Sequence, residues 1–192
     1  MLTGIAYFQQ PLALDIWAKK ELTELASPFL DHFFLAVTNL GSPAALVMFT
    51  VLVTICLIHA EKRREGGFLA ATMLVGWGLM DEIKLLIDRP RPAGEHLTYA
   101  SGFSFPSGHS MLSLVFYGFV VYLLLASGRV KSKTALVLIG TTLVFLIGTS
   151  RIYLNVHYAS DVLGGFLIGG ILLFVAIRLM DWSRGRWFKS WQ

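Results

Sequence analysis

Residues 150–161 read S-R-I-Y-L-N-V-H-Y-A-S-D and place an arginine, a histidine and an aspartate between two long apolar runs. Arg151, His157 and Asp161 are costly to hold at the edge of a hydrocarbon layer, which favours a functional interpretation. If the chain is helical from Asn155 onward, His157 and Asp161 lie one turn apart on one face. Asp161 then accepts a hydrogen bond from one ring nitrogen and leaves the other free as a nucleophile. Arg151 offers a planar fork of donors suited to phosphate. An ordinary helix start with an i,i+4 pair is the alternative for this segment alone.

A second candidate segment, residues 84–92, reads K-L-L-I-D-R-P-R-P at the end of another apolar run. Lys84 would be a costly lone charge in lipid, so it is expected either to face the interior of a helix bundle or to reach the membrane surface. For Lys84 alone, the membrane surface is the favoured alternative. For Arg89 and Arg91, an ordinary loop beside the membrane is the alternative.

A third segment, residues 105–110, reads F-P-S-G-H-S directly before the next apolar run. Proline, serine and glycine in this order are typical of a helix start. Backbone N–H groups that lack partners there, together with the helix dipole, form a natural anion site. His109 beside that site could donate a proton to a leaving oxygen. A capped helix with its histidine at the wet interface is the alternative.

Together the three segments read K-x6-R-P, P-S-G-H and S-R-x5-H-x3-D, each at the edge of an apolar run. This resembles the type 2 phosphatidic acid phosphatase superfamily, which includes bacterial acid phosphatases and vanadium haloperoxidases. The resemblance covers about residues 28–180. It implies that His157 is the nucleophile, that Asp161 orients it and that His109 is the acid toward the leaving group. It also implies a phosphate-binding set of three cations and two helix-start residues: Lys84, Arg91, Arg151, Ser107 and Gly108.

The composition excludes an ordinary soluble domain. Of the 192 residues, 55% are hydrophobic and only 15% are charged, and the mean hydropathy is +0.66. A spanning helix needs about 20 apolar residues. We therefore expect an all-α, polytopic transmembrane helical bundle forming one membrane-embedded domain over residues 1–192. About five spanning helices are predicted, over residues 43–60, 68–87, 110–127, 134–150 and 162–180.

The segment before the first predicted span is more polar. Residues 12–30 mix apolar and charged side chains, which predicts an amphipathic helix at the membrane interface, and a short helix is expected over residues 29–40. Membrane members of the superfamily typically have six spans, and residues 1–30 are too polar to supply the first. Asp81 and Glu82 lie inside the second predicted span and are expected to pair with Lys84 or a neighbour.

The basic residues predict the orientation of the bundle. Ten of the 16 lysines and arginines fall on one side of a five-span arrangement, which identifies that side as cytoplasmic. The three candidate segments then face the periplasm or the cell exterior, in a multi-pass protein of the inner or plasma membrane. Basic loops of this kind account for the net charge of +4, so no nucleic-acid partner is expected. The ten residues are Lys62, Arg63, Arg64, Arg129, Lys131, Lys133, Arg178, Arg184, Arg186 and Lys189.

The expected function is hydrolysis of a lipid phosphate monoester or pyrophosphate through a phosphohistidine. Undecaprenyl pyrophosphate is preferred because carrier lipid is released on the outer side in bacteria; phosphatidylglycerophosphate and phosphatidic acid also fit. No carboxylate cluster or H-E-x-x-H pattern indicates a catalytic metal, so no metal or cofactor is expected. A lipid phosphotransferase and a non-catalytic lipid-binding or transport protein remain alternatives. The oligomeric state is left open.

Overall fold

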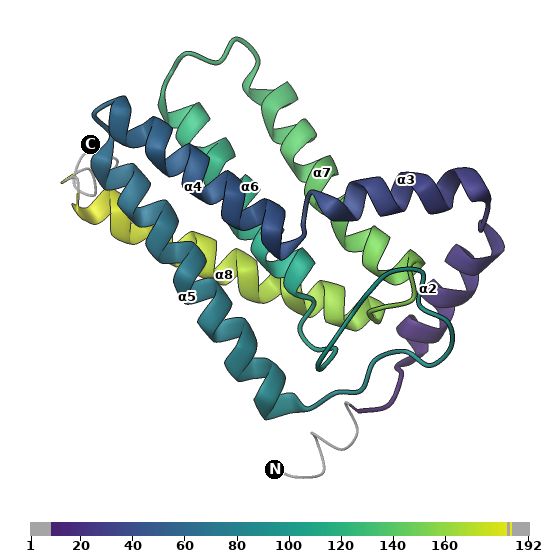
Figure 1. The fold of residues 1–192 in the computed structure, drawn as a ribbon. Helices are drawn as coiled ribbons and strands as arrows, with labels where there is room; N and C mark the ends of the chain where they lie inside the picture. Colours follow the sequence, from purple (N-terminus) through teal and green to yellow (C-terminus); the bar gives the residue numbers. More distant parts are fainter. Residues whose placement is uncertain (1–8, 184, 186–192) are drawn as a thin grey trace.

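The computed structural model describes residues 9–183 and 185, and the regular secondary structure of this part of the chain is entirely α-helical (Figure 1). The expected all-α class is therefore confirmed. The helices are α2 (Ala13–Glu24), α3 (Pro28–Asn39), α4 (Pro43–His59), α5 (Arg63–Ile87), α6 (Gly108–Ala126), α7 (Lys133–Tyr153) and α8 (Ala159–Ser183).

The helix starts follow from local sequence chemistry. Ser27 and Ser42 cap α3 and α4, each accepting a hydrogen bond from a first-turn amide at 3.3 Å. Pro28 and Pro43 occupy the first helical position, where a residue without an N–H loses no helical bond. Serine followed by proline therefore separates α2, α3 and α4.

Three helices, α6, α7 and α8, are each long and apolar enough to cross a membrane, and α3 and α4 together would form a fourth span bent by 44°. Composition alone thus supports three or four spans among the described residues. α5, the remaining predicted span, has 25 residues and is about 37 Å long. Its ends are charged, with Arg63 and Arg64 in the first turn and Asp81, Glu82 and Lys84 near the last, which explains why composition does not select it.

α6 lies at the centre of the bundle and contacts α4, α5, α7 and α8 (Figure 1). Its approach to α8 depends on glycine. A Cβ atom on Gly165 would lie 2.7 Å from the carbonyl oxygen of Ser107, and one on Gly169 would lie 2.6 Å from that of Met111. Because these neighbours are backbone atoms that cannot move aside, the two glycines hold the start of α8 against the start of α6.

The candidate segments and the basic loops lie at opposite ends of the bundle. α7 has 21 residues, so its two ends are about 30 Å apart, with Lys133 at one and Arg151 at the other. At the basic end, Arg64 donates to the carbonyl oxygen of Ser183 at 2.9 Å. The α4–α5 and α6–α7 connections lie at this same end (Figure 1). Three of the ten basic residues lie outside the described part of the chain: Arg184, Arg186 and Lys189.

The N-terminal helices cover the opposite end, where α2 contacts α7 and α8 and α3 contacts α7. Of the helix predicted over residues 12–30, the structure forms the part from Ala13 to Glu24, as α2; its place at the membrane interface stays a prediction. Ile16 and Trp17 on α2 are 62% and 60% exposed, whereas Asp15 is 2% exposed. This helix thus turns apolar side chains outward and an acid inward. Exposed tryptophan and isoleucine are typical of a helix that lies on a membrane surface.

Candidate active site

A cavity of about 430 Å³ opens at the end of the bundle that α2 and α3 cover. Its walls come from the start of α4 and the turn before it, the end of α5, the 88–107 connection, the start of α6, the end of α7 and the turn before α8. Residues far apart in the chain, from three separate motifs, therefore meet in one place. Six of the eight predicted site residues line this cavity: Lys84, Arg91, Gly108, His109, Arg151 and His157.

His157 lies in a turn and not on a helix. A helix from Asn155 onward, the condition under which His157 and Asp161 would share one helical face, is not formed, because α7 ends at Tyr153 and α8 begins at Ala159. Asn155 has a φ of 56°, a left-handed conformation that asparagine tolerates better than most residues. The amide of His157 donates to the carbonyl oxygen of Arg151 at 3.1 Å. The turn thereby brings the imidazole back over the end of α7.

The contacts of the His157 ring identify which nitrogen carries the proton. Nε2 lies 3.3 Å from Nη1 of Arg91, and an arginine can only donate, so Nε2 is the acceptor. Nδ1 then carries the hydrogen and faces Oδ2 of Asp161 at 3.5 Å and Oγ of Ser104 at 3.4 Å. The lone pair of Nε2 therefore lies on the side of the ring that faces Arg91 and the cavity, and not on the side of Asp161. Nucleophilic attack on a bound phosphate requires this tautomer.

Burial keeps this imidazole neutral. The side chain of His157 is almost entirely buried, and loss of water lowers its pKa to about 4. The hydrogen bond that Nδ1 donates to Asp161 opposes this shift in pKa, while Arg91 and Arg151 reinforce it. Since the protonated ring has no lone pair to attack with, the low pKa leaves His157 in its nucleophilic form at neutral pH.

Asp161 lies behind His157, fully buried and outside the cavity wall. One carboxylate oxygen accepts from Nη1 of Arg89 at 2.5 Å. The other accepts from the hydroxyl of Ser104 at 2.5 Å and from the amide of Tyr158 at 2.9 Å. These donors hold the carboxylate ionised and fix its direction toward the imidazole.

Sequence reasoning missed several partners of Asp161. An ordinary loop beside the membrane was the alternative for Arg89, yet its side chain is fully buried. Its second donor group reaches Asp15 of α2 at 2.8 Å. Ser104 was not singled out, and Ser160 donates to Asp15 through both its amide and its hydroxyl at 2.8 Å. The run R-P-R-P signalled Arg89, but nothing in the sequence pairs residue 89 with residue 15.

Carbonyl oxygens of the 88–107 connection hold two of the predicted phosphate-binding cations. Arg91 donates to Ser101 at 2.6 Å and to Gly102 at 3.0 Å, and Lys84 donates to Phe103 at 2.6 Å. The expected pairing of Lys84 with Asp81 or Glu82 is not found among the ion pairs of residues 9–183. Asp81 instead lines the cavity. Neutral carbonyls position the two cations without forming an ion pair with them, so both cations remain able to bind an anion.

Arg151, the third predicted cation, is 3% exposed and donates through Nη1 to the hydroxyl of Thr38 on α3 at 2.6 Å. Its Nε is buried and has no hydrogen-bond partner within the described chain. An unmatched buried donor on a guanidinium is costly unless a ligand fills it. Arg151 itself lines the cavity, so its guanidinium is placed to bind an anionic ligand there.

The start of α6 supplies the cavity with backbone and a histidine. Gly108 and His109 line the cavity, and their first-turn amides lie at the positive end of the helix. Ser107 was expected in the phosphate-binding set, but it is not among the residues that line the cavity. Its hydroxyl instead accepts from the amide of Ser110 at 3.4 Å, and its own amide donates to the carbonyl oxygen of Asp161 at 3.1 Å. Ser107 therefore caps α6 and joins it to α8.

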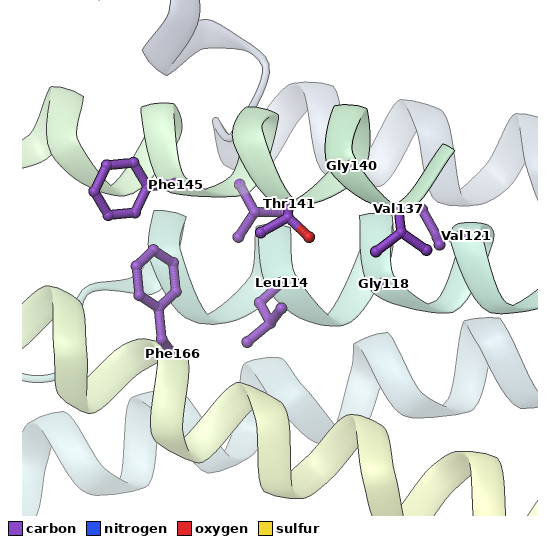
Figure 2. Close-up of a pocket in the computed structure, with 9 residues that line it drawn as sticks. Leu114, Gly118, Val121, Val137, Gly140, Thr141, Phe145 and Phe166 are labelled. Carbon is purple, nitrogen blue, oxygen red and sulfur yellow. The ribbon is translucent and has the colours of Figure 1, made fainter. Parts of the chain in front are cut away.

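A second cavity, of about 310 Å³, lies between α6 and α7 beside Phe166 of α8 (Figure 2). Its labelled walls are apolar apart from Thr141. It contains no charged side chain. It therefore lacks groups for phosphate chemistry, in contrast to the cavity around His157.

Comparison with known proteins agrees with the motifs. The PAP2 superfamily model matches residues 65–185. Phosphatidylglycerophosphatase B of Bacillus subtilis (strain 168) is 32% identical over 159 residues, covering 82% of this chain and 78% of that protein. An uncharacterized 22.5 kDa protein in the cps region of Klebsiella pneumoniae is 36% identical over 74 residues, which cover 38% of this chain and 35% of that one.

Two solved structures share the fold. One is the crystal structure of a transmembrane PAP2 type phosphatidylglycerolphosphate phosphatase from Bacillus subtilis. It has a TM-score of 0.82 and 30% identity, with 87% of this chain and 84% of that chain covered. The other is LpxE of Aquifex aeolicus, with a TM-score of 0.70 and 27% identity, and 87% and 96% of the two chains covered. The predicted resemblance is thus confirmed, and this chain belongs to the PAP2 superfamily and shares the fold of its transmembrane phosphatases.

Proposed function

We propose that this protein is an integral-membrane lipid phosphatase that works through a phosphohistidine on His157. The observation that carries the proposal is the meeting of three cations with the unprotonated Nε2 of a buried histidine on one cavity. A phosphate group brings concentrated negative charge, which Lys84, Arg91 and Arg151 are placed to bind. The same charges stabilise the transition state of phosphoryl transfer.

The proposed reaction has two displacements. In the first, Nε2 of His157 attacks phosphorus, the bond from phosphorus to the leaving oxygen breaks, and His109 donates a proton to that oxygen. The Nδ1–H faces Asp161, which stabilises the positive charge that develops on the ring. In the second, His109 takes a proton from water, the water oxygen attacks phosphorus, and the nitrogen–phosphorus bond breaks. Inorganic phosphate leaves and His157 is restored.

The remaining walls of the cavity favour a lipid substrate. Apolar residues of three helices also line the cavity: Pro43 and Leu46 of α4, Trp77 and Met80 of α5, and Leu112 of α6. A phosphate could therefore contact the charged groups while its hydrocarbon chain lies along these apolar residues. The names of the Bacillus subtilis relatives contain phosphatidylglycerophosphate as the substrate. This lipid, phosphatidic acid and undecaprenyl pyrophosphate are therefore the substrates to compare.

The test of the proposed function is phosphate release from these three lipids by the purified protein in lipid nanodiscs. We expect at least one lipid to be hydrolysed with a kcat/KM well above that of glycerol 3-phosphate, which has the phosphate but no hydrocarbon chain. Tight lipid binding without phosphate release would contradict hydrolysis. Release that requires an added alcohol acceptor, with the phosphate found on that acceptor, would instead indicate a phosphotransferase.

Hydrolysis is expected to persist in excess EDTA, because the charge of the phosphate is met by Lys84, Arg91 and Arg151. No group of three His, Cys, Asp or Glu side chains within the described residues could hold a metal ion. Orthovanadate should inhibit by occupying the phosphate position. Phosphate release before and after dialysis against EDTA checks this expectation. Loss of activity that only magnesium restores would contradict it.

The cavity is expected to face the periplasm or cell exterior, because the basic connections lie at the other end of the bundle. Single cysteines at Glu95 and Lys131, introduced separately in a Cys56→Ala background, test this orientation. An impermeant maleimide applied to intact cells should label position 95, and position 131 only after the membrane is permeabilised. Labelling of position 131 but not 95 on intact cells would reverse the orientation.

A further inference from the structure

Three buried charges form a chain that leads away from the proposed nucleophile. Arg89 donates to Asp161 at 2.5 Å through one terminal nitrogen and to Asp15 at 2.8 Å through the other. The side chains of Asp161, Arg89 and Asp15 are all fully buried in these ion pairs. They come from α8, the 88–107 connection and α2, so these two ion pairs join three segments that are distant in sequence.

The net charge of the three groups Asp161, Arg89 and Asp15 matters for His157. Two carboxylates share one guanidinium, so the three groups together carry a net charge of −1. If Arg89 had only Asp161 as its partner, it would neutralise the carboxylate that faces the imidazole. Because Arg89 divides its donors between two acids, Asp161 is held in place while the group retains a negative charge next to the ring. Asp161 and the ring of His157 are 3.5 Å apart, and buried charges at such a distance interact strongly because little water screens them.

We propose that Asp15 and Arg89 are positioning residues for the histidine–aspartate pair. Arg89 fixes the carboxylate of Asp161 against Nδ1 of His157, and Asp15 balances the charge of Arg89. The negative charge of Asp161 thereby remains available to the imidazolium-like ring that forms as Nε2 bonds to phosphorus. α2, which lies on the outside of the bundle, thus supplies a residue on which the catalytic step depends. The inference rests on the proposed function.

A purely structural role is the competing explanation, since the same contacts attach α2 to the bundle. The amide and hydroxyl of Ser160 both donate to Asp15 at 2.8 Å, so any change at residue 15 also affects how α2 is held. The two explanations differ in what they predict. A loose α2 would weaken the fold and act independently of Asp161, whereas charge balance acts only through Asp161.

Asp15→Asn is the informative variant because it removes the charge and keeps the shape. We expect kcat to fall about 30-fold, the scale of one lost hydrogen bond to a charged group, with KM changed by less than about twofold. Formation of the phosphohistidine, followed by rapid quench, should slow by the same factor. Glu24→Gln is the matched control, because Glu24 lies on the same helix, exposed, with Lys20 3.9 Å away. It should retain the wild-type kcat.

A double-mutant cycle with Asp161→Asn decides between the explanations. If Asp15 acts through Asp161, the Asp15→Asn change should cause little further loss of kcat once Asp161 is neutral. An undiminished 30-fold loss in that background, or a wild-type kcat for Asp15→Asn alone, would overturn the proposal. If Asp15→Asn does not fold, Arg89→Lys replaces it in the same cycle. Lysine keeps the positive charge but has fewer donors. An undiminished loss of kcat in the Asp161→Asn background, or a wild-type kcat for Arg89→Lys alone, would again overturn the proposal.

The proposed function can fail separately from this inference. If His157→Ala retains hydrolysis and its covalent adduct, the proposed nucleophile is wrong, whatever Asp15→Asn does. If His157→Ala and Asp161→Asn both lose activity while Asp15→Asn does not, only the role of Asp15 and Arg89 is wrong.

Discussion

His157→Ala is expected to abolish turnover on every substrate, with kcat reduced by about 10⁵-fold or more, the scale seen when a catalytic nucleophile is removed. The loss should not depend on the leaving group, because the ring forms the bond to phosphorus in the first step. Acid-labile phosphate trapped on the protein by rapid quench with ³²P-labelled substrate should appear in the wild type and be absent from the variant. Peptide mapping should place it at residue 157.

The matched control for this experiment is His32→Ala. His32 lies on α3, and its ring contacts the carbonyl oxygen of Pro28 at 2.6 Å on the exposed side of that helix. Its removal should leave both turnover and the trapped phosphate unchanged. Trapped phosphate that persists in His157→Ala would require another nucleophile and would contradict the proposed mechanism.

The burial of His157 also predicts the pH range over which its imidazole ring stays neutral. Burial lowers the pKa of His157 to about 4, below the ordinary value near 6.5. A depressed pKa means that the neutral, nucleophilic form dominates at all pH values above about 4. The ring resonances of His157, assigned by comparison with His157→Gln, should therefore stay those of a neutral imidazole from pH 8 to pH 5. A transition near pH 6.5 would contradict this prediction.

His109→Ala is expected to have the second-largest effect, and its size should depend on the leaving group. Removing a general acid typically lowers the rate by about 10²- to 10⁴-fold. A lipid alkoxide is a strongly basic leaving group and should show a loss within that range. p-Nitrophenolate leaves without protonation, so formation of the phosphohistidine from p-nitrophenyl phosphate should slow by less than about tenfold.

His109→Ala should also slow the second step, the attack of water on the phosphohistidine. His109 is the proposed base for the attacking water, so the variant should accumulate phosphohistidine when the leaving group is good. Quenched samples taken over time with p-nitrophenyl phosphate would measure this accumulation. If His109→Ala instead loses the adduct with that substrate while His157→Ala keeps it, the two histidine assignments must be exchanged.

The predictable part of this protein is what local chemistry determines. Apolar runs of about 20 residues have the length at which a helix spans lipid and satisfies its own backbone, which determined the all-α class. Serine followed by proline determined where α3 and α4 begin. The three motifs carried the PAP2 membership, because the spacing of residues within each motif can be read directly from the chain.

The turn at His157 shows where periodicity misleads. A four-residue spacing is the spacing of a helical pair, so His157 and Asp161 were expected on one helix. The chain instead reverses at Asn155, whose φ is 56°, and α8 begins only at Ala159. The two side chains still come within 3.5 Å. Several backbone paths can bring the same pair together, and the spacing alone does not distinguish them.

By itself, the sequence determined the helical class and the motif residues. Only the tertiary structure decided how the charges of this protein are shared. Ser107 was expected in the phosphate cradle, but it caps α6 and bonds to Asp161. Asp15 and Arg89 are 74 residues apart, and no local pattern records that they meet. The physical reason is that a buried ion pair is defined by which charges lose water together, and packing of helices distant in sequence decides that.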